Sequence, residues 1–149
     1  MGQRWIRKRQ AAYRQLVRQI SEREAVHEAE EIVGAAWMAG LVEAEGQAAT
    51  ARRVCTHMRD SAYEVYRSAK AGSDAQRLSE SYRELAASQQ ALCRVRERHE
   101  GLRRFAERER AAWFEAERTR ALEVLADRDR LAEAARAAGM EEERTHEHR

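Results

Sequence analysis

Apolar residues recur every seven positions along residues 4–70, and the chain contains no proline. The sevens fall on Ile6, Tyr13, Ile20, His27, Gly34, Leu41, Ala48, Cys55, Ala62 and Ala69. A companion row, three residues after the sevens, includes Leu16, Trp37, Ala44, Ala51, Met58 and Val65. From Gly34 onward both rows are apolar or small, which predicts a coiled-coil helix rather than an ordinary amphipathic one.

The pattern is interrupted between Ile20 and Gly34. Polar side chains occupy the expected seam there, at Arg23, His27 and Glu30. A shifted apolar set runs alongside them, at Val26, Ala29 and Val33. We interpret this stretch as a stutter, in which the heptad is lost briefly and the supercoil relaxes.

Three glycines lie in the same segment, at Gly34, Gly40 and Gly46. Each costs a helix about 1 kcal/mol relative to alanine. Either they let a partner helix approach closely, or the helix bends there. A full break near Gly34–Gly46 would give a compact four-helix bundle, which is the alternative to a continuous helix.

A second heptad segment covers residues 75–138. Its sevens are Leu78, Leu85, Leu92, His99, Ala106 and Trp113. Its companion row holds Ser81, Ser88, Val95, Leu102 and Ala116. Gly139 is a suitable helix stop, and we expect the polar tail 139–149 to be frayed.

Residues 71–74 separate the two segments. Gly72 is able to adopt the left-handed conformation that ends a helix, and Ser73 or Asp74 is able to cap the next one. We therefore predict one all-α domain over residues 1–149, a long antiparallel two-helix coiled-coil hairpin.

With this turn, residues whose numbers add up to about 147 lie opposite each other. Gly34 then faces Trp113, and Ala48 faces His99, which we interpret as a polar layer that sets the register. The predicted register-setting core is Gly34, Trp37, Leu41, Leu85, Leu92, His99 and Trp113.

Composition fits long helices, because 36% of the 149 residues are charged and only 6% are aromatic. The formal net charge of +2 gives no global field towards nucleic acid or membrane. No apolar run reaches the roughly 20 residues of a membrane span, and no signal-peptide core follows the N-terminus. We expect a cytoplasmic protein, with Cys55 and Cys93 as reduced thiols rather than a disulfide.

No pattern of catalytic chemistry emerges. There is no glycine-rich phosphate loop, no Ser-His-Asp arrangement and no CxxC pair. Most carboxylates alternate with arginines, as at residues 96–98 and 108–110, which is typical of solvated ion-pair faces. His146 and His148 could hold a metal only weakly. We predict no catalytic residue, no cofactor and no metal.

Charge is distributed unevenly along the chain. Basic and aromatic residues open it, at Arg4, Trp5, Arg7, Lys8, Arg9 and Arg14. Acidic side chains dominate from Glu24 to Glu45 and again from Glu141 to Glu147. Internal charge pairing is one interpretation. The others are docking to an acidic protein and binding to nucleic acid, with Trp5 stacking on bases.

The basic start at residues 4–9 and the arginine-rich run at residues 103–113 are compatible with one known family. In length and hairpin pattern the whole chain resembles the stalk proteins of type III secretion export, of the flagellar FliJ and injectisome YscO types. That resemblance implies a non-enzymatic cytoplasmic protein that docks into the ring of a hexameric export ATPase and contacts the membrane export gate.

Two other functions stay open. One is a nucleic-acid-associated coiled coil that uses the basic first 23 residues. The other is a structural homodimer that packs through apolar positions off the seam, at Val17, Val54, Tyr63, Tyr66 and Phe105.

Overall fold

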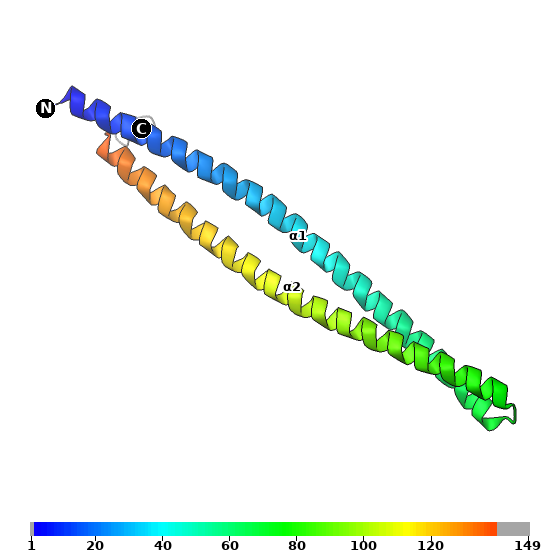
Figure 1. The fold of residues 1–149 in the computed structure, drawn as a ribbon. Coiled ribbons are helices and arrows are strands. Elements are labelled where there is room, and N and C mark those ends of the chain that lie inside the picture. Colours follow the sequence, from blue (N-terminus) through cyan, green and yellow to red (C-terminus); the bar gives the residue numbers. More distant parts are fainter. Residues whose placement is uncertain (1, 140–149) are drawn as a thin grey trace, which may run out of the picture. The chain divides into compact units, whose positions relative to one another are not determined.

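Two long helices make up the computed structural model, which describes residues 2–139 (Figure 1). Helix α1 runs from Gln3–Ala71 and helix α2 from Ala75–Ala137. They pack against each other as a helical hairpin, with no strand in residues 2–139. The predicted all-α hairpin is confirmed. Because α1 continues through Gly34, Gly40 and Gly46, the four-helix alternative is wrong.

The turn depends on Asp74 and not on a left-handed glycine. Asp74 Oδ1 accepts hydrogen bonds from the backbone amides of Gln76 (3.0 Å) and Arg77 (3.3 Å), which caps α2. The Gly72 amide donates to the Ala69 carbonyl at 3.2 Å. That tightened last turn closes α1 without a positive φ, so the conformation predicted for Gly72 is wrong.

Gly139 is the residue with a positive φ, 70°, within residues 2–139. Its amide donates to the Arg136 carbonyl at 3.1 Å, directly after α2 ends. The predicted stop at Gly139 is therefore confirmed. The rest of the predicted tail, with His146 and His148, lies outside the described residues.

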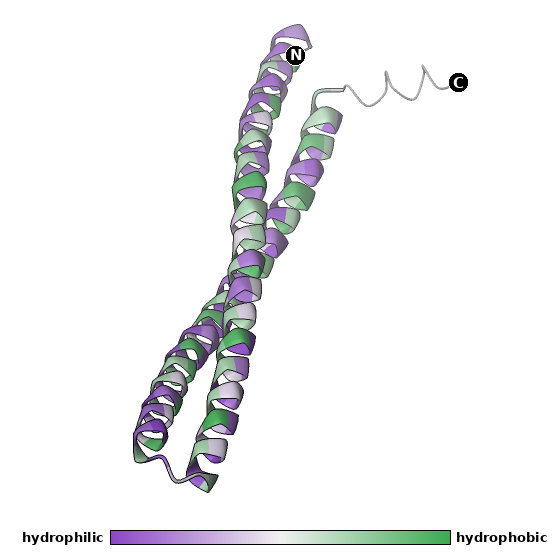
Figure 2. Ribbon diagram, turned by 90° about the vertical axis from the view of Figure 1, so that its right-hand side faces the viewer, coloured by the Kyte–Doolittle hydropathy of each residue, from purple (hydrophilic) through white to green (hydrophobic). Residues whose placement is uncertain are grey.

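The hairpin divides into two compact units. The turn-side unit is Trp37–Ala111, and the terminal unit combines the chain up to Ala36 with the chain from Ala112 onward. Hydrophobic and hydrophilic residues alternate along both helices (Figure 2), so each unit relies on a narrow seam rather than a broad apolar face.

In the turn-side unit the companion row of α1 lies four residues after the sevens, not three. The shielded row is Met38, Glu45, Arg52, Arg59 and Tyr66. In the predicted row, Trp37 is 51% exposed, Met58 59% and Val65 45%, so these three lie outside the seam. Charged residues are tolerated in the shielded row because their long aliphatic stems pack while their charged groups reach water.

In the terminal unit the sevens continue straight through the polar stretch. Ile20 is buried and His27 and Gly34 are half-buried, whereas Val26 and Val33 are exposed. The shifted set expected there, including Ala29, is therefore wrong.

The stutter lies at Gly34 instead. Up to Gly34, side chains three residues after the sevens reach α2, as Arg23 and Glu30 do. Beyond it, the shielded companion comes four residues later, at Met38. Helix α2 makes the same change after Trp113, whose shielded companion is Glu117. A step of four in both helices is the spacing of a stutter.

Candidate functional site

Asp127 is the centre of a charged cluster in the seam of the terminal unit. Its side chain is only 8% exposed. It accepts hydrogen bonds from the Arg23 guanidinium at 3.0 Å across the hairpin and from the Arg130 guanidinium at 3.1 Å on its own helix. Two cations thus satisfy a nearly buried carboxylate.

Two further pairs cross the same seam. His27 Nε2 lies 2.9 Å from a Glu123 carboxylate oxygen. Arg120, 11% exposed, donates to Glu30 at 3.2 Å and to Glu117. The hydrogen bond that Arg120 donates to Glu117, with smaller contributions from Glu30, raises the pKa of the Arg120 guanidinium above its ordinary value.

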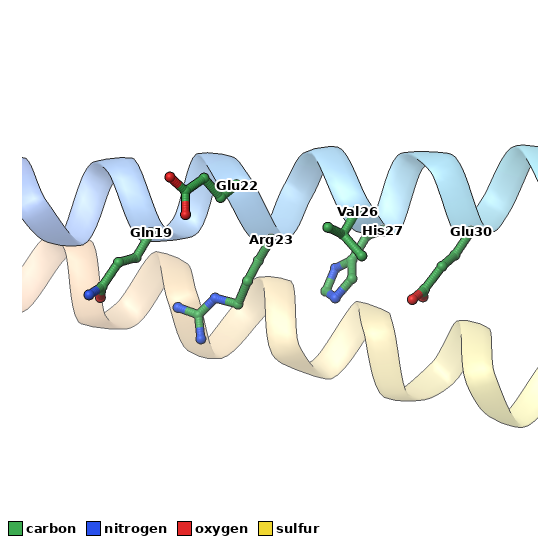
Figure 3. Close-up of a pocket in the computed structure, with 6 residues that line it drawn as sticks. All are labelled: Gln19, Glu22, Arg23, Val26, His27 and Glu30. Atoms are coloured by element: carbon green, nitrogen blue, oxygen red, sulfur yellow. The ribbon is translucent and has the colours of Figure 1, made fainter.

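We call the residues of these three interhelical pairs the polar seam: Arg23, His27, Glu30, Arg120, Glu123 and Asp127. Its three members on α1 point towards α2 in Figure 3, whereas Glu22 points away. They line a shallow open pocket together with Gln19 and Val26. Arg23, His27 and Glu30 each already have a partner on α2, namely Asp127, Glu123 and Arg120 respectively, and no group of three potential metal ligands exists among the described residues. We interpret these pairs as contacts that set the register of the two helices, which is the best-attested use of partly buried charge.

The sequence-predicted binding residues lie together on the first turns of α1. Arg4, Trp5, Arg7, Lys8, Arg9 and Arg14 are all exposed. The Arg9 guanidinium lies over the Trp5 ring, 3.9 Å from its centroid, and the ring is still 49% exposed. We call these six residues the basic end. Its cations form no ion pair with any of residues 2–139, including the acidic stretch from Glu24 to Glu45.

The predicted register residues are distributed as follows. Gly34 lies against Trp113, since a Cβ placed on the glycine would come 2.6 Å from the indole Nε1. Leu41, Leu85 and Leu92 are buried.

His99 is half-buried, and its Nδ1 lies 3.4 Å from an Arg52 guanidinium nitrogen, one turn beyond the expected partner Ala48. Trp37 lies beside the seam. Its Nε1 donates to Glu109 at 3.0 Å, and its ring meets Phe105 edge-on at 6.3 Å.

The positions expected to support a homodimer fall into two groups, exposed ones and ones that contact other aromatic rings. Val17, Val54 and Tyr63 are exposed, at 37%, 53% and 49%. Tyr66 belongs to the seam, where its ring lies 6.0 Å from that of Tyr82. Phe105 is partly covered by Trp37.

Sequence reasoning missed the three interhelical pairs of the polar seam, because it interpreted Arg23, His27 and Glu30 as a break in the pattern. The signal was opposite charge between residues whose numbers add up to 150. In the predicted register of about 147, His27 would face Arg120 and Glu30 would face Glu117. Glu123 and Asp127 stand opposite His27 and Arg23, and Arg120 stands opposite Glu30.

Cys55 and Cys93 are free thiols. Within residues 2–139, neither helix has a stretch long and apolar enough to cross a membrane. Comparison with protein-family models, curated proteins and solved structures finds no match to this chain.

Proposed function

We propose that this chain is a non-enzymatic helical-hairpin interaction protein that binds an acidic protein partner through the basic end. The observation that carries this proposal is the exposure of all six basic-end residues, whose cations have no anionic partner among residues 2–139. Clustered cations of this kind steer association with an oppositely charged surface.

The specific form of the proposal is a cytoplasmic stalk component of a type III secretion ATPase complex. Its support is the resemblance in length and pattern together with the two-helix hairpin. In the terminal unit, the first turns of α1 and the last turns of α2 lie side by side (Figure 1). That end, including residues 122–138, is the part that we expect to enter the ATPase ring.

Co-purification with a hexameric export ATPase, with ATP hydrolysis measured in the presence and absence of this chain, tests the proposal. We expect a salt-sensitive complex and a changed hydrolysis rate, because the docking is electrostatic. No association together with an unchanged rate would exclude the stalk function.

Binding to nucleic acid is the second candidate, favoured by the same basic end and by the half-exposed ring of Trp5. Gel shift across a salt series separates the two functions. Phosphate binding weakens steeply as salt rises. Absence of a shift at low salt would exclude binding to nucleic acid and leave an acidic protein as the proposed partner.

A further inference from the structure

One face of α1 in the turn-side unit carries no charge over its whole length, and nine of its ten positions are exposed. Its residues recur with the three–four spacing of a coiled-coil seam: Trp37, Gly40, Ala44, Gln47, Ala51, Val54, Met58, Ser61, Val65 and Ser68. We call this face the uncharged stripe. Its large members are about half exposed, from 45% at Val65 to 59% at Met58.

The neighbouring faces of the same helix are different. The exposed positions next to the stripe include Glu43, Arg53, Asp60, Glu64 and Arg67. The chain is 36% charged, so a regular face of ten uncharged positions is unusual in it. This face has the residue pattern of a second coiled-coil seam. It extends over about 46 Å of helix, at 1.5 Å per residue.

We propose that the uncharged stripe is an interface between two copies of this chain, with the two α1 helices antiparallel about a two-fold axis between Ala51 and Val54. A two-fold interface must be self-complementary, so residue i meets residue j and j meets i. Centred there, residues whose numbers add up to 105 face each other.

The sizes of the facing side chains support this register. The pairs are Trp37 with Ser68, Gly40 with Val65, Ala44 with Ser61, Gln47 with Met58, and Ala51 with Val54. Three of the five levels pair a large side chain with a small one, whereas Ala44 with Ser61 pairs two small side chains and Gln47 with Met58 pairs two long, flexible ones. Pairing of large with small side chains lets facing seams interdigitate without voids.

Charge selects α1 of the second copy over its α2. Exposed uncharged residues occur on α2 up to Cys93. From Arg94 to Arg108, however, every exposed position except Phe105 is charged, so a partner as long as the stripe would have to cover this charged part. Packing it against the stripe would remove charges from water without providing counter-charges, which is unfavourable. The uncharged stripe itself meets no such penalty.

Sedimentation of the full chain over a range of concentrations measures the association. We expect a concentration-dependent dimer whose dissociation constant rises at least about tenfold in the Val54→Glu variant, because two carboxylates would lie within one turn of each other in an apolar contact. Val42→Glu is the matched control: Val42 is also on α1, 60% exposed and off the stripe. A monomer at every concentration, or equal effects of the two substitutions, would overturn the proposal.

Cysteine cross-linking tests the antiparallel register, in a background with Cys55→Ala and Cys93→Ala. Mixing the Ala44→Cys and Ser61→Cys variants is expected to give a cross-linked dimer under mild oxidation. Neither variant should cross-link alone, since the two copies of one site lie about 26 Å apart along the helices, well beyond disulfide reach. Cross-linking of each variant with itself would indicate parallel helices and refute this arrangement.

Discussion

Gly34 and Trp113 form a close small-against-large contact between the two helices. A Cβ on Gly34 would lie 2.6 Å from the indole Nε1 and 3.0 Å from Cδ1. The indole Nε1 is buried without a hydrogen-bond partner in the structure, so the contact is steric rather than polar. The absence of a side chain at residue 34 is therefore what lets the Trp113 ring enter the seam.

Gly34→Ala is expected to destabilise the hairpin by about 1–3 kcal/mol, even though alanine favours helix, because the rigid indole has to move. Urea unfolding followed by circular dichroism measures this change. Combining Gly34→Ala with Trp113→Leu should recover part of the loss, since leucine occupies less of the space that the methyl group needs.

Gly46→Ala is the matched control, because Gly46 lies on the same helix and off the uncharged stripe. Nothing lies within 4 Å of a Cβ at this exposed position. The substitution should stabilise the protein by about 1 kcal/mol through helix propensity alone. Opposite signs at the two glycines are the expected result, and the same sign at both would refute a steric role for Gly34.

At the scale of the elements, capping decides where α2 begins. Asp74 accepts two amide hydrogen bonds of the first turn. Asp74→Ala should lower the free energy of unfolding by about 1 kcal/mol. Ser73→Ala, one residue earlier, serves as the control and should change it little, because the capping bonds go to Asp74. Equal losses in the two variants would contradict this assignment of the cap.

The polar seam pairs the helices of the terminal unit by charge. Asp127 is 8% exposed and joins Arg23 and Arg130. Asp127→Ala should cost about 1–2 kcal/mol, since both guanidiniums lose a charge-assisted hydrogen bond. Asp129→Ala makes the same chemical change at an exposed neighbour and should have little effect. Thermal unfolding of the two variants compares them, and equal effects would rule out the seam as the cause.

The two units differ in how much of their seam is apolar. The turn-side unit buries Leu41, Leu85 and Leu92 and, within residues 37–111, has one interhelical ion pair, Arg110–Glu45. The terminal unit buries Ile20 and has three charged pairs in the described part of its seam. Because exposed and half-exposed ion pairs contribute little net stability, we expect the terminal unit to open first on heating. Amide hydrogen exchange resolved by residue measures that order.

At the scale of the whole molecule, the residues proposed to bind the partner are different from those that stabilise the hairpin. Reversing the charges of Arg4, Arg7, Lys8 and Arg9 to glutamate should abolish partner binding and leave the melting temperature nearly unchanged, because all four side chains are exposed. Reversing Arg94, Arg104 and Arg108, which are exposed on α2, is the control and should preserve binding. Loss of binding in both variants would point to a general charge effect.

Much of the fold was predictable because its signals are local. Absence of proline, a seven-residue period and the short break at residues 72–74 are each read within a few turns of chain. The buried sevens, from Ile20 through Leu41 to Ala69, follow from that period alone. The basic end was predictable as a cluster, since its members are neighbours in sequence.

The companion row was not predictable in the same way. Every row of sevens is bordered by one row three residues later and another four residues later, on opposite sides. Apolar character favoured the first row, with Trp37, Met58 and Val65, but the other helix approaches from the second. Local sequence carries no information about the side from which a distant segment arrives.

The sequence by itself determined two helices, their ends and the turn between them, because periodicity, capping and helix propensity act over short separations. Only the tertiary structure decided which side of each helix is shielded, that the stutter falls at Gly34 and Trp113, and that the polar side chains at residues 23, 27 and 30 each have a partner on α2. Those outcomes depend on contacts between residues up to 104 positions apart. They also leave the uncharged stripe facing outward, where a second copy of the chain is able to cover it.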